Sequence, residues 1–364
     1  MRQKKKMKVL IDVGHPGHVH YFKNLWKTLR DRGHEFLFIA RDREVIIQLL
    51  NSYNIRYLNR GKGSDSKIGK LLYMIYADAF ILNASIKFKP DLLLSFGSPY
   101  TAQVSRLINV PHVALNDTEH TDIIHKKFTY PFTDTIITPL NYQHKLGTKQ
   151  IRINCTIEYF YLHPKFYRPD ISIYQLLGIS PETKYAIVRF VSWNAFHDVN
   201  QHGLTLSQKR DIISLLKQNY KVFISSERAI EPEFEAYQIK IPPHRMHDAL
   251  AYASIFVGES GTMASESAML GTPVVYINSL PLMCYLKLEQ DYGILKHFST
   301  GDGVFDYIEH IIQNDHVKEE ATQHRDKMVS GFINPTEFLG WFIENYPKSR
   351  VIMKDNPGYQ YTFK

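Results

Sequence analysis

The stretch Gly14–Phe22 combines three histidines, two glycines and one proline directly after a short apolar run. A metal site needs its ligands on one face. If the chain is helical from Val19 onward, His18 and His20 point in different directions. His15 and His18 can meet, but no HExxH motif or acidic partner lies nearby. A dinucleotide loop needs a third glycine near position 19, which is a valine. The stretch therefore favours neither a metal nor a dinucleotide.

The chemistry that remains for this stretch is acid–base catalysis. Imidazole titrates near neutral pH and can take a proton from a sugar hydroxyl. His18 stands where the expected turn becomes a helix, so we predict that it is catalytic; a helix cap or a packing residue is the alternative. Gly14 and Gly17 suit a tight turn and are predicted to line the substrate. His15 and His20 are expected to shape the loop.

A second stretch, GESGTMASE, stands at another expected turn from strand to helix. Backbone N–H groups at a helix start bind phosphate well, and a carboxylate further along the same helix can accept hydrogen bonds from a ribose diol. Five residues are predicted to bind such a nucleotide: Gly258, Ser260, Gly261, Thr262 and Glu266. The alternative is that Ser260 only caps the helix and Glu266 is a solvated surface acid.

Two further strand ends in the first half carry polar side chains. SFGSPY places Ser98 in a turn, and NDTEH places Asn116, Asp117 and Glu119 after the next expected strand. Carboxylates of this kind serve as general bases. We predict that Asp117 assists His18 in catalysis, and that Ser98 and Glu119 contact the substrate.

Three charged or titratable residues of the second half are also candidates for substrate binding. Arg189 and Glu227 stand at expected strand ends, where contact with the substrate and an ion pair or surface charge are equally open alternatives. His197, with Asp198, lies in the loop SWNAFHD and could act as an acid or base or contact a phosphate, and a surface loop is equally open.

The elements that must position these residues follow from the order of apolar runs. In the first half, apolar runs alternate with helical periods at 8–13, 34–40, 55–59, 91–97, 112–116 and 134–139. After residue 140 the rhythm breaks into an expected linker, and it restarts with runs at 184–190, 221–227, 255–260 and 273–278. Strands that alternate with helices form parallel sheets, whose ligands bind beyond the carboxyl ends of the strands.

This rhythm predicts an α/β protein of two Rossmann-like domains that face each other across a cleft. We place the domain expected to bind the substrate that accepts the transferred group (the acceptor domain) at residues 1–165. The domain expected to bind the nucleotide-linked substrate (the donor domain) is placed at 166–364, with the last helices free to pack back on the first domain. Opposite walls of the cleft would then carry His18 and Glu266.

Composition limits the partners. The chain has 364 residues and a net charge of +8, which favours nucleotide phosphates, an acidic membrane surface or nucleic acid. No helix-turn-helix or RNP-type signal is present, so nucleic acid is not expected. Cys155 and Cys284 stand far apart, without a CxxC motif, which argues against a zinc knuckle or a disulfide scaffold. No secretory signal is evident, so a cytoplasmic protein is expected.

Two segments, 67–87 and 121–132, mix aromatic residues with lysines. Such a mixture could mark a membrane-facing patch for a lipid-linked acceptor. The alternative is a helix that packs its apolar side on the sheet. The first segment carries charged and amide side chains, which make it a poor membrane-spanning helix.

The string from Glu259 to Pro273 resembles the nucleotide-sugar signature of the GT-B superfamily. It aligns without a gap with the corresponding stretch of non-hydrolysing UDP-N-acetylglucosamine 2-epimerases. It is also similar to the glycosyltransferase that makes lipid II, which has a Ser-Gly, a ribose-binding Glu and a Gly-x-Pro. The GHV at 17–19 resembles the GGHV loop of that transferase, whose histidine lies at the reaction centre. The same resemblance implies that Arg189 and Glu227 line the diphosphate and the base of the nucleotide.

The chain resembles, over nearly its whole length, an uncharacterised GT-B-like family of archaea and bacteria that is defined by a domain of unknown function. The resemblance is carried by five stretches: HPGHVHYF, SFGSPY, NDTEH, SWNAFHD and GESGTMASE. The chain departs from the epimerases at their catalytic acids. Ser98 stands where an Asp is expected, and Asn116 or Asp117 where a Glu is expected. The loop RFVSWNAFHD replaces their HRREN.

The resemblance implies a metal-independent GT-B glycosyltransferase that uses a nucleoside-diphosphate sugar, with UDP as the expected carrier. No DxD motif is present, and no cofactor is expected beyond the nucleotide-sugar co-substrate. The expected acceptor is a surface polysaccharide or a lipid-linked sugar at the inner face of the membrane, which makes the enzyme a peripheral membrane protein of polysaccharide biosynthesis. The alternative functions are a nucleotide-sugar 2-epimerase or hydrolase, and a binding protein without catalysis.

Overall fold

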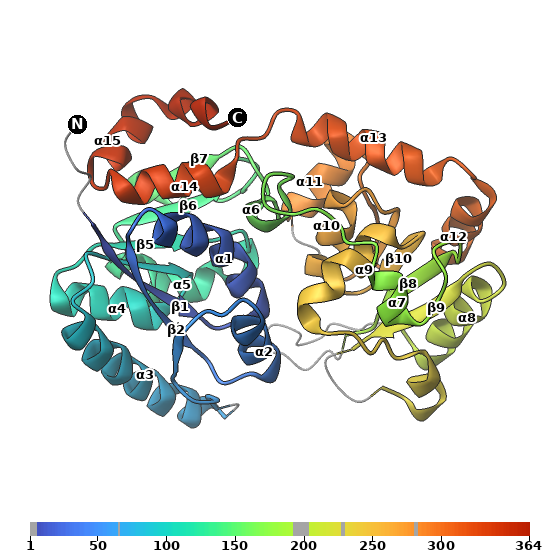
Figure 1. The fold of residues 1–364 in the computed structure, drawn as a ribbon, viewed down its shortest axis with the longest axis horizontal. Helices are drawn as coiled ribbons and strands as arrows, with labels where there is room; N and C mark the ends of the chain where they lie inside the picture. The colour runs from blue at the N-terminus through green and yellow to red at the C-terminus, as the bar shows by residue number, and fades with distance from the viewer. Residues whose placement is uncertain (1–5, 65, 192–203, 227–229, 280–282) are drawn as a thin grey trace. The chain divides into compact units, whose positions relative to one another are not determined.

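The structure is a computed structural model and describes residues 6–64, 66–191, 204–226, 230–279 and 283–364 (Figure 1). It divides into two compact units: Met1–Phe166 together with Phe332–Lys364, and Tyr167–Gly331. The grouping of the last segment with the first unit is the return packing that the sequence left open for the last helices.

The N-terminal unit is built on seven parallel strands in the order β3-β2-β1-β4-β5-β6-β7. The strands are β1 (Lys8–Val13), β2 (Glu35–Ala40), β3 (Tyr57–Asn59), β4 (Leu92–Phe96), β5 (His112–Leu115), β6 (Thr135–Pro139) and β7 (Gln150–Ile153). The central strands are apolar and almost fully buried, as expected when helices cover both faces of a parallel sheet.

The expected linker after residue 140 was wrong at β7. This strand pairs with β6 at the edge of the sheet, and only Ile151 and Ile153 are buried. A four-residue edge strand with polar residues at alternate positions leaves too short an apolar pattern to be recognised.

Helices cover both faces of this sheet. They are α1 (Pro16–Asp31), α2 (Glu44–Ser52), α3 (Lys67–Phe88), α4 (Pro99–Ile108), α5 (Asp122–Phe128), α6 (Tyr159–Leu162), α14 (Pro335–Glu344) and α15 (Lys348–Asp355). One layer joins α1 to α2, α6 and α14, and the other joins α3, α4 and α5. Gly340 of α14 faces Leu25 and Leu29 of α1, so the returning C-terminal segment completes the first layer (Figure 1).

The second unit is built on five parallel strands in the order β12-β11-β10-β8-β9. The strands are β8 (Tyr185–Arg189), β9 (Lys221–Ser225), β10 (Ile255–Gly258), β11 (Val274–Ile277) and β12 (Lys296–Phe298). The helices are α7 (Ile173–Leu177), α8 (Leu206–Leu216), α9 (Met246–Tyr252), α10 (Gly261–Met269), α11 (Met283–Tyr292), α12 (Val304–Gln313) and α13 (Val317–Val329).

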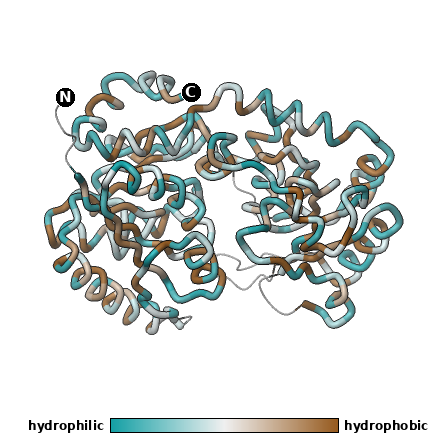
Figure 2. Tube along the Cα trace, in the orientation of Figure 1, coloured by the Kyte–Doolittle hydropathy of each residue, from teal (hydrophilic) through white to brown (hydrophobic). Residues whose placement is uncertain are grey.

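Each unit has its own apolar core. In the second unit Val188, Val257 and Val275 lie on neighbouring buried strands, and Ile212 and Ile308 pack from α8 and α12. Figure 2 shows the hydrophobic residues concentrated along the strands of both units. Polar side chains inside or directly after these strands are therefore the exceptions that need explanation.

Candidate functional site

The turn after β1 is shaped by its own histidine and glycines. His15 caps α1, and its Nδ1 accepts a hydrogen bond from the backbone N–H of Gly17 at 3.2 Å. A Cβ on Gly17 would lie 3.0 Å from Tyr21 Oη, and a Cβ on Gly14 would lie 3.4 Å from Arg60 Nη2. Close packing alone therefore requires glycine at position 17.

His18 lies on the first turn of α1 and its ring is held on several sides. The backbone N–H of Gly14 donates to His18 Nδ1 at 3.3 Å. The ring centroid lies 5.0 Å from that of Phe96 and 6.0 Å from that of Tyr21. Because Nδ1 accepts a hydrogen bond, the neutral ring carries its proton on Nε2. The geometry thus presents His18 as an Nε2–H donor.

The surroundings of His18 keep it uncharged at neutral pH. Burial lowers the pKa of His18 well below 6.5, and the positive charges of His15, Arg60, Arg43 and His125 lower it further. A group in this setting is neutral before it meets a substrate.

An ion pair that the sequence analysis missed lies beneath this turn. Arg60 Nε donates to Asp12 Oδ1 at 2.8 Å, and the two side chains are only 2% and 1% exposed. Arg60 Nη1 also donates to Tyr73 Oη at 2.5 Å, and its guanidinium carbon lies 4.9 Å from the centre of the Tyr100 ring. Removing one partner would leave a buried charge uncompensated. The signal in the sequence was Asp12 inside an otherwise apolar strand.

The residues after β4 and β5 have structural partners that the sequence analysis did not foresee. Ser98 caps α4, and its Oγ accepts from the backbone N–H of Thr101 at 3.4 Å. Asn116 is fully buried and its Nδ2 donates to Tyr130 Oη at 2.7 Å and to Tyr142 Oη at 3.1 Å. Asn116 is therefore committed to a buried network.

Two carboxylates remain at the end of β5, and both are buried. Asp117 Oδ1 accepts from Thr118 Oγ1 at 2.6 Å, and Glu119 Oε1 accepts from the backbone N–H of Gln143 at 3.4 Å. Among the described residues, Glu119 Oε2 has no hydrogen-bond partner. Burial raises the pKa of both carboxyls, and the charge of Asp117 raises that of Glu119 further. A raised pKa suits a carboxylate to accept a proton near neutral pH.

In the second unit, α10 begins directly after β10 with small residues. Ser260 caps the helix, and its Oγ accepts from the backbone N–H of Met263 at 3.4 Å. A Cβ on Gly261 would lie 3.0 Å from Tyr276 Oη and from Tyr285 Cε2. Ser260, Gly261 and Thr262 are partly exposed, and the first turn holds no acidic residue. The first turn of α10 thus adds no negative charge that would oppose an anion.

Glu266 is buried inside the same helix, so its reading as a solvated surface acid was wrong. His247 Nε2 lies 3.0 Å from Glu266 Oε1, and the two residues are 3% and 6% exposed. His247 belongs to α9, which packs against α10. The sequence analysis missed this pair because His247 stands 19 positions away on a separate helix.

The end of β8 explains two further predicted residues. Gly258 pairs with Arg189 in the sheet, and a Cβ on Gly258 would lie 2.6 Å from Arg189 O. Close approach of the strands therefore requires this glycine without any ligand. Arg189 is buried, and its Nη1 donates to Ser225 Oγ at the end of β9 at 3.1 Å.

Glu259, the first residue of the string that resembles the GT-B signature, accepts two backbone hydrogen bonds that the sequence did not predict. Its Oε2 accepts from the backbone N–H of Val191 at 2.8 Å, and its Oε1 from that of Leu204 at 2.7 Å. One buried carboxylate thus fixes the residues on either side of segment 192–203. The predicted residues His197 and Glu227 lie outside the described part of the chain.

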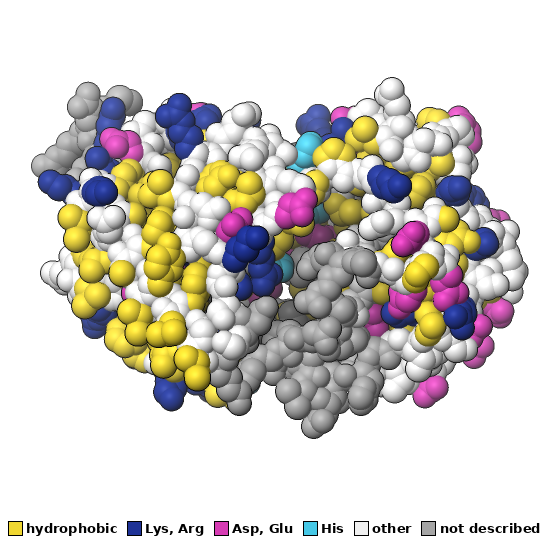
Figure 3. All heavy atoms as spheres, turned by 90° about the horizontal axis from the view of Figure 1, so that it is seen from below, with side chains coloured by type: hydrophobic (Ala, Val, Ile, Leu, Met, Phe, Trp, Pro, Cys, Tyr) yellow, Lys and Arg dark blue, Asp and Glu magenta, His cyan; other side chains and the backbone are white. Residues whose placement is uncertain are grey.

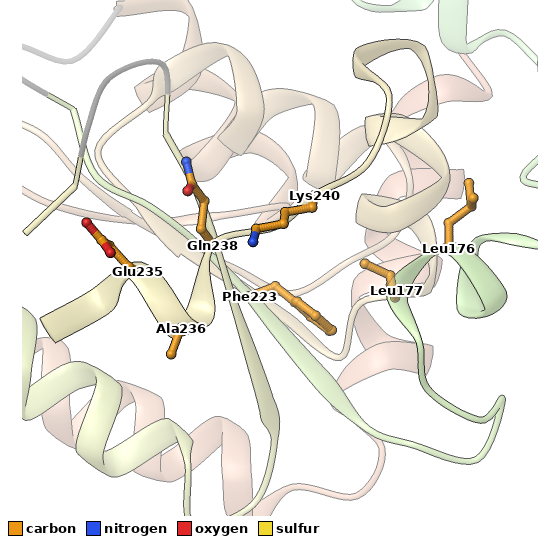
Figure 4. A pocket seen from close by; sticks show the side chains of 7 residues that line it. All are labelled: Leu176, Leu177, Phe223, Glu235, Ala236, Gln238 and Lys240. Carbon is orange, nitrogen blue, oxygen red and sulfur yellow. The ribbon is translucent and has the colours of Figure 1, made fainter. Parts of the chain in front are cut away.

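A separate hollow of about 270 Å³ in the second unit is lined by α7, β9, η4 (Pro232–Tyr237) and the segment that follows (Figure 4). Its lining side chains are Leu176, Leu177, Phe223, Glu235, Ala236, Gln238 and Lys240. None of the predicted site residues is among them. Within the described ranges, no group of three or more His, Cys, Asp or Glu side chains is placed to hold a metal ion.

Comparisons with known proteins agree with this architecture. Residues 7–326 match the family described as "Protein of unknown function (DUF354)". An uncharacterized protein of Methanocaldococcus jannaschii, MJ0665, is 29% identical over 318 residues, which cover 83% of this chain and 90% of the relative.

Solved structures of similar fold include epimerases and glycosyltransferases. A putative UDP-N-acetylglucosamine 2-epimerase from Listeria monocytogenes has a TM-score of 0.68 at 12% identity and covers 92% of this chain and 95% of its own. The Neisseria meningitidis UDP-GlcNAc 2-epimerase bound to UDP-GlcNAc has a TM-score of 0.62 at 12% identity, with 96% and 99% covered. The Streptomyces glycosyltransferase SsfS6 complexed with thymidine diphosphate has a TM-score of 0.61 at 13% identity, with 93% and 99% covered.

At these identities the solved structures establish the fold alone. The family match spans most of the sequence and both units. The chain therefore belongs to the DUF354 family, and its two units are the Rossmann-like domains of a GT-B fold.

Proposed function

We propose that this protein is a glycosyltransferase that uses a nucleoside-diphosphate sugar, with UDP as the carrier. One observation carries the proposal: α10 opens with partly exposed small residues, and Glu266, further along the same helix, is held by His247. The fold is shared with proteins whose structures contain UDP-GlcNAc or thymidine diphosphate, which supports a nucleotide-linked substrate.

In the proposed donor site the diphosphate lies against the backbone N–H groups that open α10. These groups and the helix dipole favour a negative charge, and no acidic side chain in the first turn opposes it. The Glu266 carboxylate accepts hydrogen bonds from the ribose diol, in the orientation that His247 gives it. Residues of the chain supply all of these contacts.

In the proposed reaction an acceptor hydroxyl oxygen forms a bond with the anomeric carbon while the bond from that carbon to the diphosphate breaks. The diphosphate leaves with the electron pair. His18 keeps its proton and donates a hydrogen bond from Nε2–H to an oxygen at the reaction centre, because Nδ1 is occupied by the N–H of Gly14. Asp117, whose pKa is raised by burial, takes the hydroxyl proton. This assignment exchanges the base role first expected of His18 for a donor role.

A panel of nucleotide sugars tests the proposal by thermal shift and by release of the nucleoside diphosphate. We expect stabilisation by UDP-linked sugars in the native protein and a clear loss of that stabilisation in Glu266→Ala. The His34→Gln protein, altered at a buried pair in the other unit, serves as the control and should respond like the native protein. The absence of stabilisation by every nucleotide sugar would contradict the proposal.

A nucleotide-sugar 2-epimerase or hydrolase is the second candidate. The observation in its favour is the pair of buried carboxylates Asp117 and Glu119 with raised pKa values at one strand end. Incubation with UDP-sugars in heavy water, without an acceptor, separates the candidates. Exchange of deuterium into C2 of the sugar would establish epimerase chemistry and exclude the transferase proposal.

A further inference from the structure

Helix α3 carries apolar residues on two sides. Its buried side includes Ala77, Ile81 and Ala84, and Ile81 and Ala84 belong to the core that contains Leu10 and Leu93 of the sheet. Within the described residues, α3 is the one helix long and apolar enough to cross a membrane, yet only 22% of its most apolar window is buried. Since one side packs on the sheet, α3 belongs to the helical layer, and its second side needs a separate explanation.

The second side is an exposed apolar stripe. Its members are Ile68 (75% exposed), Leu71 (56%), Leu72 (61%), Ile75 (61%) and Tyr76 (51%). Their spacing of three and four residues places them on one face of the helix. Figure 3 shows clusters of hydrophobic side chains at the surface of the N-terminal unit. A stripe of this size exceeds the scattered apolar residues of an ordinary surface.

Helix α5, which packs on α4 as α3 does, carries two further exposed apolar residues. Ile123 and Ile124 are 81% and 49% exposed. The side chain of Gln103 on α4 links the two helices, since its Nε2 donates to Phe128 O of α5 and approaches Met74 Sδ of α3 at 4.0 Å. We name the seven exposed residues the α3–α5 surface: Ile68, Leu71, Leu72, Ile75, Tyr76, Ile123 and Ile124.

The charges around the α3–α5 surface have one sign. Lys70, Lys126 and Lys127 are exposed beside it. In the described parts of α3, α4 and α5 no acidic side chain is exposed, because Asp78 is half-buried and Asp122 is buried. An apolar stripe flanked by lysines matches an anionic lipid bilayer, whose headgroups attract the lysines and whose acyl boundary accepts the apolar groups.

The helices that carry the α3–α5 surface also contact the carboxyl ends of the strands, where His18 lies. Tyr73, on α3, contacts Arg60 under the turn that bears Gly14. His125, on α5, lies against Gly97 at the end of β4, where a Cβ on Gly97 would be 2.7 Å from its ring. A bilayer on this surface would therefore lie beside the proposed acceptor site.

We infer that the α3–α5 surface docks on an anionic lipid bilayer. The apolar side chains enter the boundary between headgroups and acyl chains, and the lysines contact lipid phosphates. The inference deepens the proposed function, on which its consequence rests: the acceptor is a lipid-linked hydroxyl that reaches His18 from the bilayer.

Sedimentation of the full chain with vesicles tests the docking without any sugar substrate. We expect binding to vesicles of phosphatidylcholine with phosphatidylglycerol and weaker binding to phosphatidylcholine alone. The triple variant Leu71→Ser, Leu72→Ser, Ile75→Ser should lower the partition coefficient at least about ten-fold, because exposed groups that would enter the lipid are removed. The variant Lys126→Glu, Lys127→Glu should weaken binding to the anionic vesicles at low salt.

A matched control removes aliphatic groups of similar exposure from other helices and turns. Ile171, Leu176 and Val351 are 60%, 44% and 56% exposed, and their replacement by Ser should leave vesicle binding unchanged. Failure of the native chain to bind anionic vesicles, or equal loss in both triple variants, would overturn the inference. Light scattering would also overturn the inference if it showed that the native protein is a dimer and the α3 triple variant a monomer, since a second copy of the chain would then cover the surface. Because no nucleotide sugar is present, failure here leaves the proposed chemistry untouched.

Discussion

The two units share one architecture, but different kinds of groups lie at the carboxyl ends of their strands. The N-terminal edge presents side chains: His18 is set among aromatic rings and other cations, above the buried pair Asp12–Arg60. The C-terminal edge presents mainly backbone, at Ser260–Thr262, with the single carboxylate of Glu266 behind it. Backbone N–H groups suit a phosphate that every nucleotide carries, whereas side chains with displaced pKa values suit proton transfer. Under the proposed function, this difference assigns nucleotide binding to the C-terminal edge and chemistry to the N-terminal edge.

The largest expected effect tests the chemical edge. His18→Ala should lower the turnover number by about 10²–10³-fold, the usual contribution of a hydrogen-bond donor placed where negative charge develops in the transition state. The dissociation constant of UDP, measured by calorimetry, should stay unchanged, since the opening of α10 is intact. If His18→Ala also lowered the affinity for UDP, the proposal that one edge binds the nucleotide and the other performs the chemistry would be contradicted.

Replacement of His18 by Gln or by Asn sharpens this test, because each side-chain amide can imitate one of the two ring nitrogens. In His18→Gln the amide nitrogen reaches the position of Nε2, so a donor remains, and turnover should exceed that of His18→Asn. Equal loss in both proteins would contradict the donor role derived from the hydrogen bond between Gly14 N–H and Nδ1.

Acid should destabilise the N-terminal unit. His112 is buried between Ser95 Oγ and Thr133 Oγ1, and burial lowers its pKa to about 3. Its folded pKa lies below the unfolded value, so the unfolded chain binds the proton more readily. The stability it contributes is complete above pH 6.5 and falls as the pH decreases from 6.5 toward 3, by about 2 kcal/mol at pH 5.

Urea unfolding followed at pH 7 and pH 5 measures this loss. His112→Asn serves as the comparison: the variant is less stable at pH 7, and it should lose less of its remaining stability between the two values. An equal pH dependence in both proteins would show that other groups govern acid stability.

A smaller effect concerns ribose recognition at the binding edge. Glu266→Gln should lower the preference for UDP over 2′-deoxy-UDP by roughly ten-fold, because a charged acceptor of the diol is lost. His247→Gln should lower it less, since the carboxylate stays but loses its orienting partner. Competition binding with the two nucleotides measures the ratio.

The N-terminal unit supplies the matched control for this experiment. His34 Nε2 lies 3.2 Å from Glu344 Oε1, and both side chains are as buried as those of the His247–Glu266 pair. His34→Gln should cost stability without changing the ratio of the two nucleotides. If it changed the ratio as much as His247→Gln does, the effect would be one of general stability.

The smallest effect uses the two serine caps. Ser98 and Ser260 both cap a helix that follows a strand, one in each unit. Replacement of either by Ala should cost about 1 kcal/mol of stability. Only Ser260→Ala should also weaken UDP binding, by a few-fold. Equal affinities in the two variants would remove Ser260 from the proposed donor site.

The sequence predicted what depends on local pattern. Near-continuous apolar runs marked the central strands of both sheets, because burial on two faces demands them. The edge strands β7 and β12 escaped notice, since three or four residues with partial burial leave no clear period. Residues that follow strands were recognised as candidates from their position alone.

What the sequence could not predict was pairing over distance. Asp12 and Arg60 stand 48 positions apart, and His247 and Glu266 stand 19 apart on separate helices. The apolar pattern fixes neither partner, because burial of a charged side chain becomes visible only when the opposite element is in place. The same holds for Ser98 and Gly258, whose structural roles depend on neighbours that fold against them.

The return of residues 332–364 to the first unit bears on how the protein is made. Every residue of the second unit precedes residue 332, so the chain of that unit is fully synthesised before α14 leaves the ribosome. Until α14 emerges, Leu25 and Leu29 of α1 lack the helix that covers them. The unit whose synthesis begins first is thus the last to be completed, and a nascent chain halted before residue 332 carries every residue of the second unit beside an incomplete first unit.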